Sequence, residues 1–275
     1  MFARIAALFL LCVGTAHAQV NIEKLRAQPQ EDGTSGQFTA STAFTQGNID
    51  FADFVVGNYL TYKTDDHILF WVTNLRFAAK RTQGDYAEEP NVGLWDKDAH
   101  FSNNMLTHLR YNYTINDWLA WEVYSQYEYN EFLLLDRRVL GGTGPRFTLI
   151  DEKGGGLWIG TSGMVENERL NAESIEEGLN PESTIARWSN YITGELSPSD
   201  KVSWVTTLYY QPRIPVFGDF RFVGETGLAI NLSEKFAFTT DFRVRHDADP
   251  PGTADEVPEV MATDISLKNG IAIKW

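Results

Sequence analysis

Apolar and polar residues alternate along most of the chain, so that apolar side chains recur at every second position. The C-terminal segment is the clearest case: Ile265, Leu267, Ile271 and Ile273 are separated by polar or small residues, and the chain ends on Trp275. A period of two places successive side chains on opposite faces of a β-strand. The segment is therefore predicted to be a strand with one apolar and one polar face, as in a membrane barrel or a soluble sandwich.

Segments of this kind fill the remaining chain. The predicted strands cover residues 36–45, 51–63, 68–79, 101–115, 119–132, 145–150, 157–165, 184–195, 202–211, 220–231, 236–246 and 262–275. Most have the roughly 9–11 residues that a tilted transmembrane strand needs. The sixth is the shortest, because Gly141 to Pro145 is interpreted as a turn that leads into it.

The connections between these strands alternate in length. The short ones are residues 64–66, 116–117, 151–156, 197–200 and 233–235, and the long ones are residues 80–100, 133–144, 166–183, 212–219 and 247–258. Outer-membrane barrels have short periplasmic turns and longer outer loops. The alternation predicts an all-β fold, a transmembrane antiparallel up-and-down barrel of about 12 strands. It forms one domain over residues 34–275, closed by pairing of residues 37–45 with the last strand.

The N-terminus is typical of a secretory signal. Arg4 precedes an apolar core at residues 5–13, and cleavage is expected after Ala18, which leaves residues 19–33 as a flexible segment. The only cysteine, Cys12, lies in this signal, so the mature chain has no thiol. Aromatic residues make up 13% of a chain with a formal charge of -14. Aromatic enrichment favours a barrel, and the acidity argues against nucleic acid as a partner.

The alternation also assigns faces. On residues 101–115 and 119–132, Leu109 and Trp121 are expected to face lipid, and Arg110 and Glu122 to face the lumen within salt-bridge reach of each other. Consistent faces require an odd-numbered turn, which predicts a three-residue turn at 116–118. The charged residues expected in the lumen are Arg76, Arg110, Glu122, Glu128, Arg146, Arg187, Arg221, Glu225, Asp241, Arg243, Arg245, Asp264 and Lys268.

On this assignment the lumen leans basic and the acidic residues gather in outer loops. The acidic loop residues lie within 85–98, 166–182 and 247–259. Such acidic runs usually serve solubility. They could alternatively bind divalent cations, which prefer oxygen ligands. The spacing matches no calcium-binding loop, so no metal site and no cofactor is predicted.

Three segments in the middle of the chain resemble a known family. They are residues 108–113 (HLRYNY), residues 118–127 (WLAWEVYSQY) and residues 141–146 (GGTGPR). They are similar to a domain-of-unknown-function family of salt-induced outer-membrane proteins, and the likeness extends from residues 45–48 to the closing strand. The resemblance implies an outer-membrane barrel, and no activity or site residue. The closing strand likewise resembles the last strand of such barrels, in which Ile271, Ile273 and Trp275 would form the membrane-insertion signature.

One short motif could carry chemistry. In His100-Phe101-Ser102-Asn103, the imidazole and the hydroxyl lie two residues apart, so on a regular strand they share a face. The motif resembles outer-membrane lipid hydrolases (phospholipase A and the lipid A deacylase). The chain departs from them at Asn104, where a smaller residue is expected, and it lacks an orienting third group. We therefore favour the interpretation that these residues are an ordinary part of the strand and not a catalytic pair.

The sequence therefore predicts a barrel without enzymatic activity in the outer membrane of a Gram-negative bacterium. Its leading function is a passive conduit for small solutes or ions, or an envelope-structural role. The alternatives are a lipid hydrolase that uses His100 and Ser102, and a surface receptor or adhesin that uses the acidic loops. The expected partners are outer-membrane lipids, lipopolysaccharide and the insertion machinery, with a monomer as the default.

Overall fold

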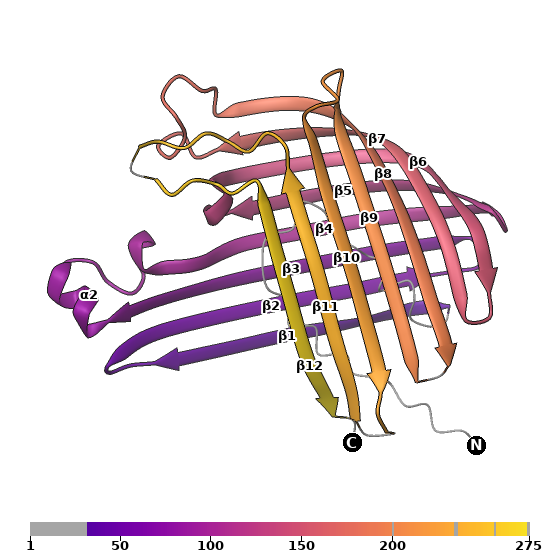
Figure 1. The fold of residues 1–275 in the computed structure, drawn as a ribbon, viewed down its shortest axis with the longest axis horizontal. Coiled ribbons are helices and arrows are strands. Elements are labelled where there is room, and N and C mark those ends of the chain that lie inside the picture. Colours follow the sequence, from indigo (N-terminus) through magenta and orange to yellow (C-terminus); the bar gives the residue numbers. More distant parts are fainter. Residues whose placement is uncertain (1–31, 200, 234–235, 256, 274–275) are drawn as a thin grey trace.

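The structure is a computed structural model that describes residues 32–199, 201–233, 236–255 and 257–273. The predicted signal, its cleavage site, most of the segment 19–33 and Trp275 lie outside these residues. Within them the chain forms one antiparallel sheet of twelve strands, each paired with its neighbours in sequence (Figure 1). This confirms the predicted all-β, up-and-down organisation.

The strands have these bounds: β1 Gly33–Thr45, β2 Ile49–Lys63, β3 His67–Thr82, β4 His100–Asn116, β5 Leu119–Asn130, β6 Leu135–Glu152, β7 Gly155–Leu170, β8 Glu182–Ser199, β9 Val202–Ile214, β10 Phe220–Asn231, β11 Phe236–Asp247 and β12 Thr263–Ile273. Among the described residues, short helices lie between strands: α2 Gln83–Glu88, η1 Lys97–Ala99 and η2 Glu131–Leu133. No helix among the described residues is long and apolar enough to cross a membrane.

The connections are sorted between the two ends of the sheet. One end, here called the loop end, carries residues 46–48, 83–99, 131–134, 171–181, 215–219 and 248–262. The other, the turn end, carries tight connections such as residues 64–66 and 153–154. The predicted long loop at 133–144 is wrong, because β6 begins at Leu135 and only a single 3₁₀ turn separates it from β5.

The glycine-rich stretch 141–145 is a strand and not the expected turn. Gly142 and Gly144 belong to β6, and they lie where neighbouring strands leave no room for a side chain. A Cβ at Gly142 would lie 2.4 Å from the ring of Tyr124, and one at Gly144 would lie 2.0 Å from the backbone oxygen of Thr161. Glycine within a strand can mark such a close approach as well as a turn.

The turn between β4 and β5 is shorter than predicted, but the two strands still have the predicted faces. Asn116 pairs with Leu119, so the connection is the two-residue hairpin Asp117-Trp118. The extra residue is Ile115, which bulges out where the register shifts between Thr114 and Asn116. The bulge supplies the odd residue, and beyond it Asn112 lies opposite Glu122, as predicted.

Side chains on the strands separate into a buried concave face and an exposed outward face. On β4, His108, Arg110 and Asn112 are buried, whereas Leu109 and Tyr111 are exposed. The same alternation holds on β5, where Glu122, Tyr124, Gln126 and Glu128 are buried between exposed neighbours. The concave face is therefore polar and charged over much of β4–β11, and the outward face is largely apolar.

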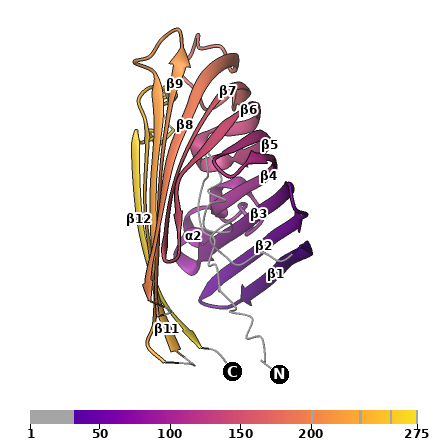
Figure 2. The same ribbon diagram turned by 90° about the vertical axis from the view of Figure 1, so that its right-hand side faces the viewer.

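The expected pairing of the first and last strands is absent from the described residues. The strand order runs from β1 to β12, and Figures 1 and 2 show these two strands apart, with β8–β12 facing β1–β5 across the curved sheet. Every residue of β1 except Gln37 is exposed, so among the described residues the outer edge of β1 is a sheet edge whose backbone groups have no neighbouring strand. The sheet is curved as in a barrel but has two open edges.

Candidate functional site

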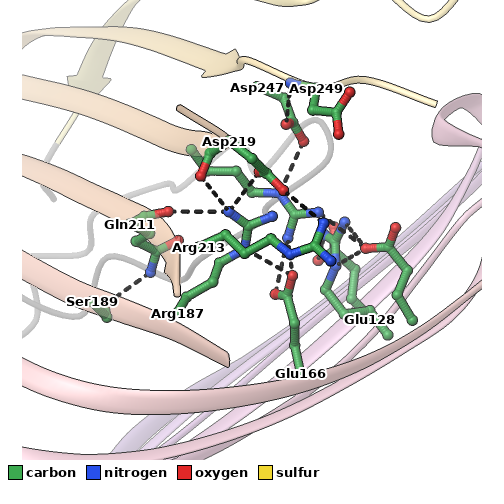
Figure 3. Close-up of polar contacts among 12 residues, drawn as sticks. Glu128, Glu166, Arg187, Ser189, Gln211, Arg213, Asp219, Asp247 and Asp249 are labelled. Carbon is green, nitrogen blue, oxygen red and sulfur yellow. Dashed lines mark hydrogen bonds and ion pairs between the residues drawn. The ribbon is translucent and has the colours of Figure 1, made fainter. Parts of the chain in front are cut away.

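The most concentrated chemistry on the concave face is a group of arginines and carboxylates near the loop end (Figure 3). We call this group the rim network. It consists of Glu128, Arg138, Glu166, Glu168, Arg187, Arg213, Asp219, Arg221 and Asp247. Its members come from β5–β11 and from the connection between β9 and β10. All except Arg213 have side chains that are mostly buried.

Arg221 is the centre of the rim network. Its Nη1 donates to both carboxylate oxygens of Glu166 at 2.9 Å, its Nη2 donates to Glu168 at 3.1 Å and its Nε donates to Asp247 at 2.9 Å. Arg221 lies on β10 and Glu166 on β7, and two strands separate them in the sheet. The ion pair therefore joins strands across the concavity and not along the wall.

Two further arginines extend the network along the rim. Arg187 donates to Glu166 at 2.9 Å and to Asp219 at 3.0 Å. Arg138 donates from Nε to Glu168 at 2.7 Å and from Nη1 to Glu128 at 3.1 Å. These bonds connect β5 with β10 and β11 without a break. The loop end of the concavity is thus crossed by a continuous set of charge-assisted hydrogen bonds.

A layer of loop residues packs together beyond the rim network. Leu134, Ile175 and Val260 are buried against one another, and they come from the three connections β5–β6, β7–β8 and β11–β12. Backbone contacts support this packing: Ile175 forms an isolated β-bridge with Thr253, and Glu176 N–H donates to Gly252 at 3.1 Å. The loop from β11 to β12 therefore packs against the connections β5–β6 and β7–β8 at the loop end.

A second buried cluster lies deeper on the concave face. Arg110 and Glu122 approach to 3.5 Å, as predicted, and the hydroxyl of Tyr191 donates to Glu122 at 2.9 Å. Arg146 donates to the same hydroxyl at 3.0 Å. Tyr191 extends from β8 across β7 and β6 to reach β5, because Gly160 has no side chain: a Cβ there would lie 2.0 Å from the Tyr191 ring.

The other charged residues predicted for the lumen lie outside these two clusters. Arg76 pairs with Asp53 at 3.1 Å, and Arg243 pairs with Glu225 at 3.2 Å. Asp241 lies opposite Lys268 in the register of β11 and β12, and Arg245 lies opposite the exposed Asp264. Arg245 is 7% exposed, and its Nη1 has no hydrogen-bond partner among the described residues.

The concave face holds more acidic residues than the sequence predicts for the lumen. Glu166 and Glu168 are strand residues of β7 and Asp247 ends β11, so the prediction that these three acids lie in outer loops is wrong. Arg138 also belongs to this face and is absent from the predicted set, because β6 begins at Leu135, ten residues before its predicted start. The signal was present: Glu166 and Glu168 continue the even-numbered series of buried residues that includes Gly160 and Met164. Strand parity, continued to the true strand end, would have found them.

The candidate dyad of His100 and Ser102 is not assembled. A β-bulge at Phe101 shifts the register, so that Ala78 pairs with Ser102 and the next residue, Ala79, pairs with His100. The bulge turns His100 to the outward side, where its ring meets Phe77 edge-on at 4.7 Å and its Nδ1 lies 3.1 Å from Glu131. The Ser102 hydroxyl is buried on the concave side and accepts from Asn104 at 3.0 Å.

The acidic loops likewise show no metal site in the described part of the chain. No group of three or more histidine, cysteine, aspartate or glutamate side chains is placed to hold a metal ion there. Several of these acids have other partners: Glu89 accepts from Arg81 at 3.4 Å, and Asp85 accepts from the backbone N–H of Thr82 at 2.6 Å. The latter bond lowers the pKa of Asp85.

Comparison with known proteins identifies the family of the chain. The family described as "Protein of unknown function, DUF481" matches residues 38–274. No curated protein matches the chain. Among solved structures, the chain is similar to the "CymD monoaromatic hydrocarbon channel", with 5% identity, a TM-score of 0.43 and coverage of 90% of this chain and 80% of that chain. It is also similar to a Pseudomonas aeruginosa FadL homologue, with 9% identity, a TM-score of 0.35 and coverage of 89% and 74%. At these TM-scores the fold assignment rests on the strand pairing described above.

Proposed function

We propose, for a chain that belongs to the DUF481 family of proteins of unknown function, that it spans the bacterial outer membrane and keeps its interior closed at the loop end. It would then serve as an envelope-structural protein and not as an open conduit. The observation that carries the proposal is the rim network, which joins β7 to β10 across the concavity through Arg221 and Glu166.

The outward face supports the membrane part of the proposal. Large apolar side chains are exposed on nearly every strand, among them Leu109, Val123, Ile192 and Leu208. An apolar surface that extends over most of a sheet is typical of a surface covered by another apolar phase. Outer-membrane barrels present such a surface to lipid and polar residues to the interior.

Exposed tryptophans on this face have their polar groups satisfied by the sheet itself. The indole N–H of Trp71 donates to Thr107, that of Trp121 to Thr143, that of Trp188 to Thr161 and that of Trp204 to Thr226, at distances of 2.6–3.1 Å. In each case the threonine belongs to the neighbouring strand. An indole that faces water needs no such partner, whereas one in hydrocarbon gains about 1–3 kcal/mol from it.

A closed interior favours an envelope-structural role over a passive conduit, two roles that the sequence does not distinguish. A conduit needs a continuous water path, whereas here buried ion pairs and the packed loop residues Leu134, Ile175 and Val260 occupy the loop end. Deeper in the concavity, Tyr191 and Glu122 join β8 to β5. Both sets of contacts favour a filled interior, which small barrels can have.

Planar-bilayer conductance tests this proposal. The mature wild-type chain should insert, as checked by flotation with liposomes, and should pass no stable unitary current. The double variant Glu166→Ala with Arg221→Ala removes the ion pair that crosses the concavity and should raise the frequency of open events. The exposed loop variant Glu177→Ala is the matched control and should stay silent. Steady wild-type channels would contradict closure, and failure to float would contradict the membrane assignment.

The lipid-hydrolase alternative has lost the observation that favoured it. His100 and Ser102 lie on opposite sides of the sheet, and the His100 ring is instead bonded to Glu131 and to the carbonyl oxygen of Trp95. Incubation with phospholipid or lipid A, with Ser102→Ala as the comparison, should give no Ser102-dependent product.

A further inference from the structure

The connection between β3 and β4, residues 83–99, folds onto the outward side of the sheet and not over its concave mouth. Its helix α2 is fixed to the loop end of β1–β3: Gln83 donates to the carbonyl of Gly47 at 2.8 Å, and the Tyr86 hydroxyl donates to Asp50 at 2.8 Å. Arg81 is 2% exposed and donates to the carbonyls of Asp85 and Glu89. These bonds give the connection a defined position.

Beyond α2, the connection lays Trp95 against aromatic rings of the outward face. The Trp95 ring stacks on Phe77 of β3 at 6.0 Å and lies 6.3 Å from Phe54 of β2. Phe44 of β1 meets Phe54 edge-on at 5.0 Å. We call Phe44, Phe54, Phe77 and Trp95 the aromatic shelf. Phe44 is 61% exposed and Trp95 is 59% exposed, so the shelf is open to whatever surrounds the protein.

The backbone under Trp95 is held by a polar group on the same outward side. His100 Nε2 lies 3.3 Å from the carbonyl oxygen of Trp95, and its Nδ1 lies 3.1 Å from Glu131. Asn103 joins this group by donating to Glu131 at 2.8 Å and to the Tyr129 hydroxyl at 3.1 Å. The motif that suggested a hydrolase therefore has another use here, which is to fix the position of the tryptophan.

From this arrangement we propose that the aromatic shelf docks into the outer leaflet of the membrane at the boundary between acyl chains and headgroups. The inference rests on the proposed membrane location and adds the depth of one side of the sheet. The shelf continues the outward apolar wall at its loop end, and tryptophan prefers this boundary because its ring is apolar and its N–H is polar.

Acidic residues on the connection limit how deeply the aromatic shelf can enter the membrane. Asp85, Glu88, Glu89, Asp96 and Asp98 flank the shelf, and all are exposed. Carboxylates stay in water because their transfer into hydrocarbon is costly. The shelf can therefore enter the leaflet only as far as its aromatic rings. A lipid surface fits these residues better than a protein partner, because the exposed rings are continuous with the wall already assigned to lipid.

Depth-dependent fluorescence quenching tests the proposal. The mature chain has no cysteine if the segment that holds Cys12 is removed, so single cysteines can be labelled with a fluorophore. The positions are Trp95→Cys on the shelf, Leu208→Cys on the outward wall and Glu177→Cys in a loop as control. The protein is reconstituted into phosphatidylcholine vesicles that carry a nitroxide either on the headgroup or in the middle of the acyl chain.

The label at position 95 should lose fluorescence most with the headgroup nitroxide, the label at 208 should lose it most with the acyl-chain nitroxide, and the label at 177 should lose little with either. Adding His100→Ala removes the contact to the carbonyl oxygen of residue 95, which the labelled variant still has, and should reduce quenching at position 95 to the level of the loop control. If position 208 is quenched and position 95 behaves like 177, or if His100→Ala has no effect, the shelf proposal is overturned and the membrane assignment stands. If position 208 is also unquenched, the proposed function itself fails.

Discussion

Neutralising Glu166 should destabilise the protein more than neutralising a solvent-exposed acid. Glu166 is 1% exposed and accepts one hydrogen bond from Arg187 and two from Arg221, all at 2.9 Å. Glu166→Gln keeps the size of the side chain but removes its charge. It leaves two buried guanidinium groups facing an amide, and the amide N–H₂ group can only repel their donors.

The cost follows from the partners that remain. Removing one member of a buried ion pair typically costs about 3–5 kcal/mol. Arg221 would still bond Glu168 and Asp247, and Arg187 would still bond Asp219, so the lower end of this range applies. We expect Glu166→Gln to lower the free energy of unfolding by about 3 kcal/mol.

Urea unfolding in detergent micelles, followed by tryptophan fluorescence, measures this change. A loss of about 3 kcal/mol at an m-value of roughly 1–3 kcal/mol per M moves the midpoint down by about 1–3 M. The control is Glu182→Gln, which breaks a 3.3 Å pair with Arg137 whose side chains are 43% and 55% exposed and which should cost at most about 1 kcal/mol. Equal, small shifts for the two variants would refute the buried position of Glu166.

Three further predictions follow from other contacts. Gly160→Ala should destabilise the protein by about 1–3 kcal/mol, because the new Cβ would displace the ring of Tyr191, whereas Gly163→Ala on the same strand meets nothing within 4 Å and should be neutral or slightly stabilising in the same urea assay. Thr143→Val should cost about 1–3 kcal/mol in vesicles by leaving the indole N–H of Trp121 without its acceptor; no cost there would argue against lipid around that indole. Backbone amides of β1 should exchange slowly with deuterium in a bilayer, where an unpaired strand edge is not tolerated, and rapid exchange of β1 beside a protected β4 would exclude that edge from the hydrocarbon.

The sequence predicted strands more reliably than it predicted where they end. Alternation alone identified all twelve strands and the faces of β4 and β5, because a half-buried strand repeats every two residues. It failed at Gly141 to Pro145, since a glycine needed for close packing against Tyr124 has the same appearance in sequence as a glycine needed for a turn. With a turn at residues 141–145, Arg138 falls in a loop, so the sequence does not predict it as a member of the rim network.

Two features depended on bulges, which no periodic pattern reveals. An extra residue at Ile115 changed the expected turn, and the bulge beside Ala79 placed His100 and Ser102 on opposite faces. The pairing across the concavity was also out of reach, because the contact between Glu166 and Arg221 depends on how tightly the sheet curves. The alternation places Glu166 and Arg221 on one face, but it does not predict that β7 and β10 lie close enough for their side chains to bond.

In the proposed arrangement the outward face contacts lipid while the concave face is closed to water. Spin labels on single cysteines at Ile192 and Leu208, which are exposed, and at Thr193 and Thr207, which are 1% and 0% exposed, test both halves at once in phosphatidylcholine vesicles. Collisions with oxygen should be frequent at 192 and 208 and rare at 193 and 207, and collisions with a water-soluble nickel chelate should be rare at all four. Frequent nickel collisions at 193 and 207 would contradict a closed interior, and frequent nickel collisions at 192 and 208 would contradict a membrane-facing wall.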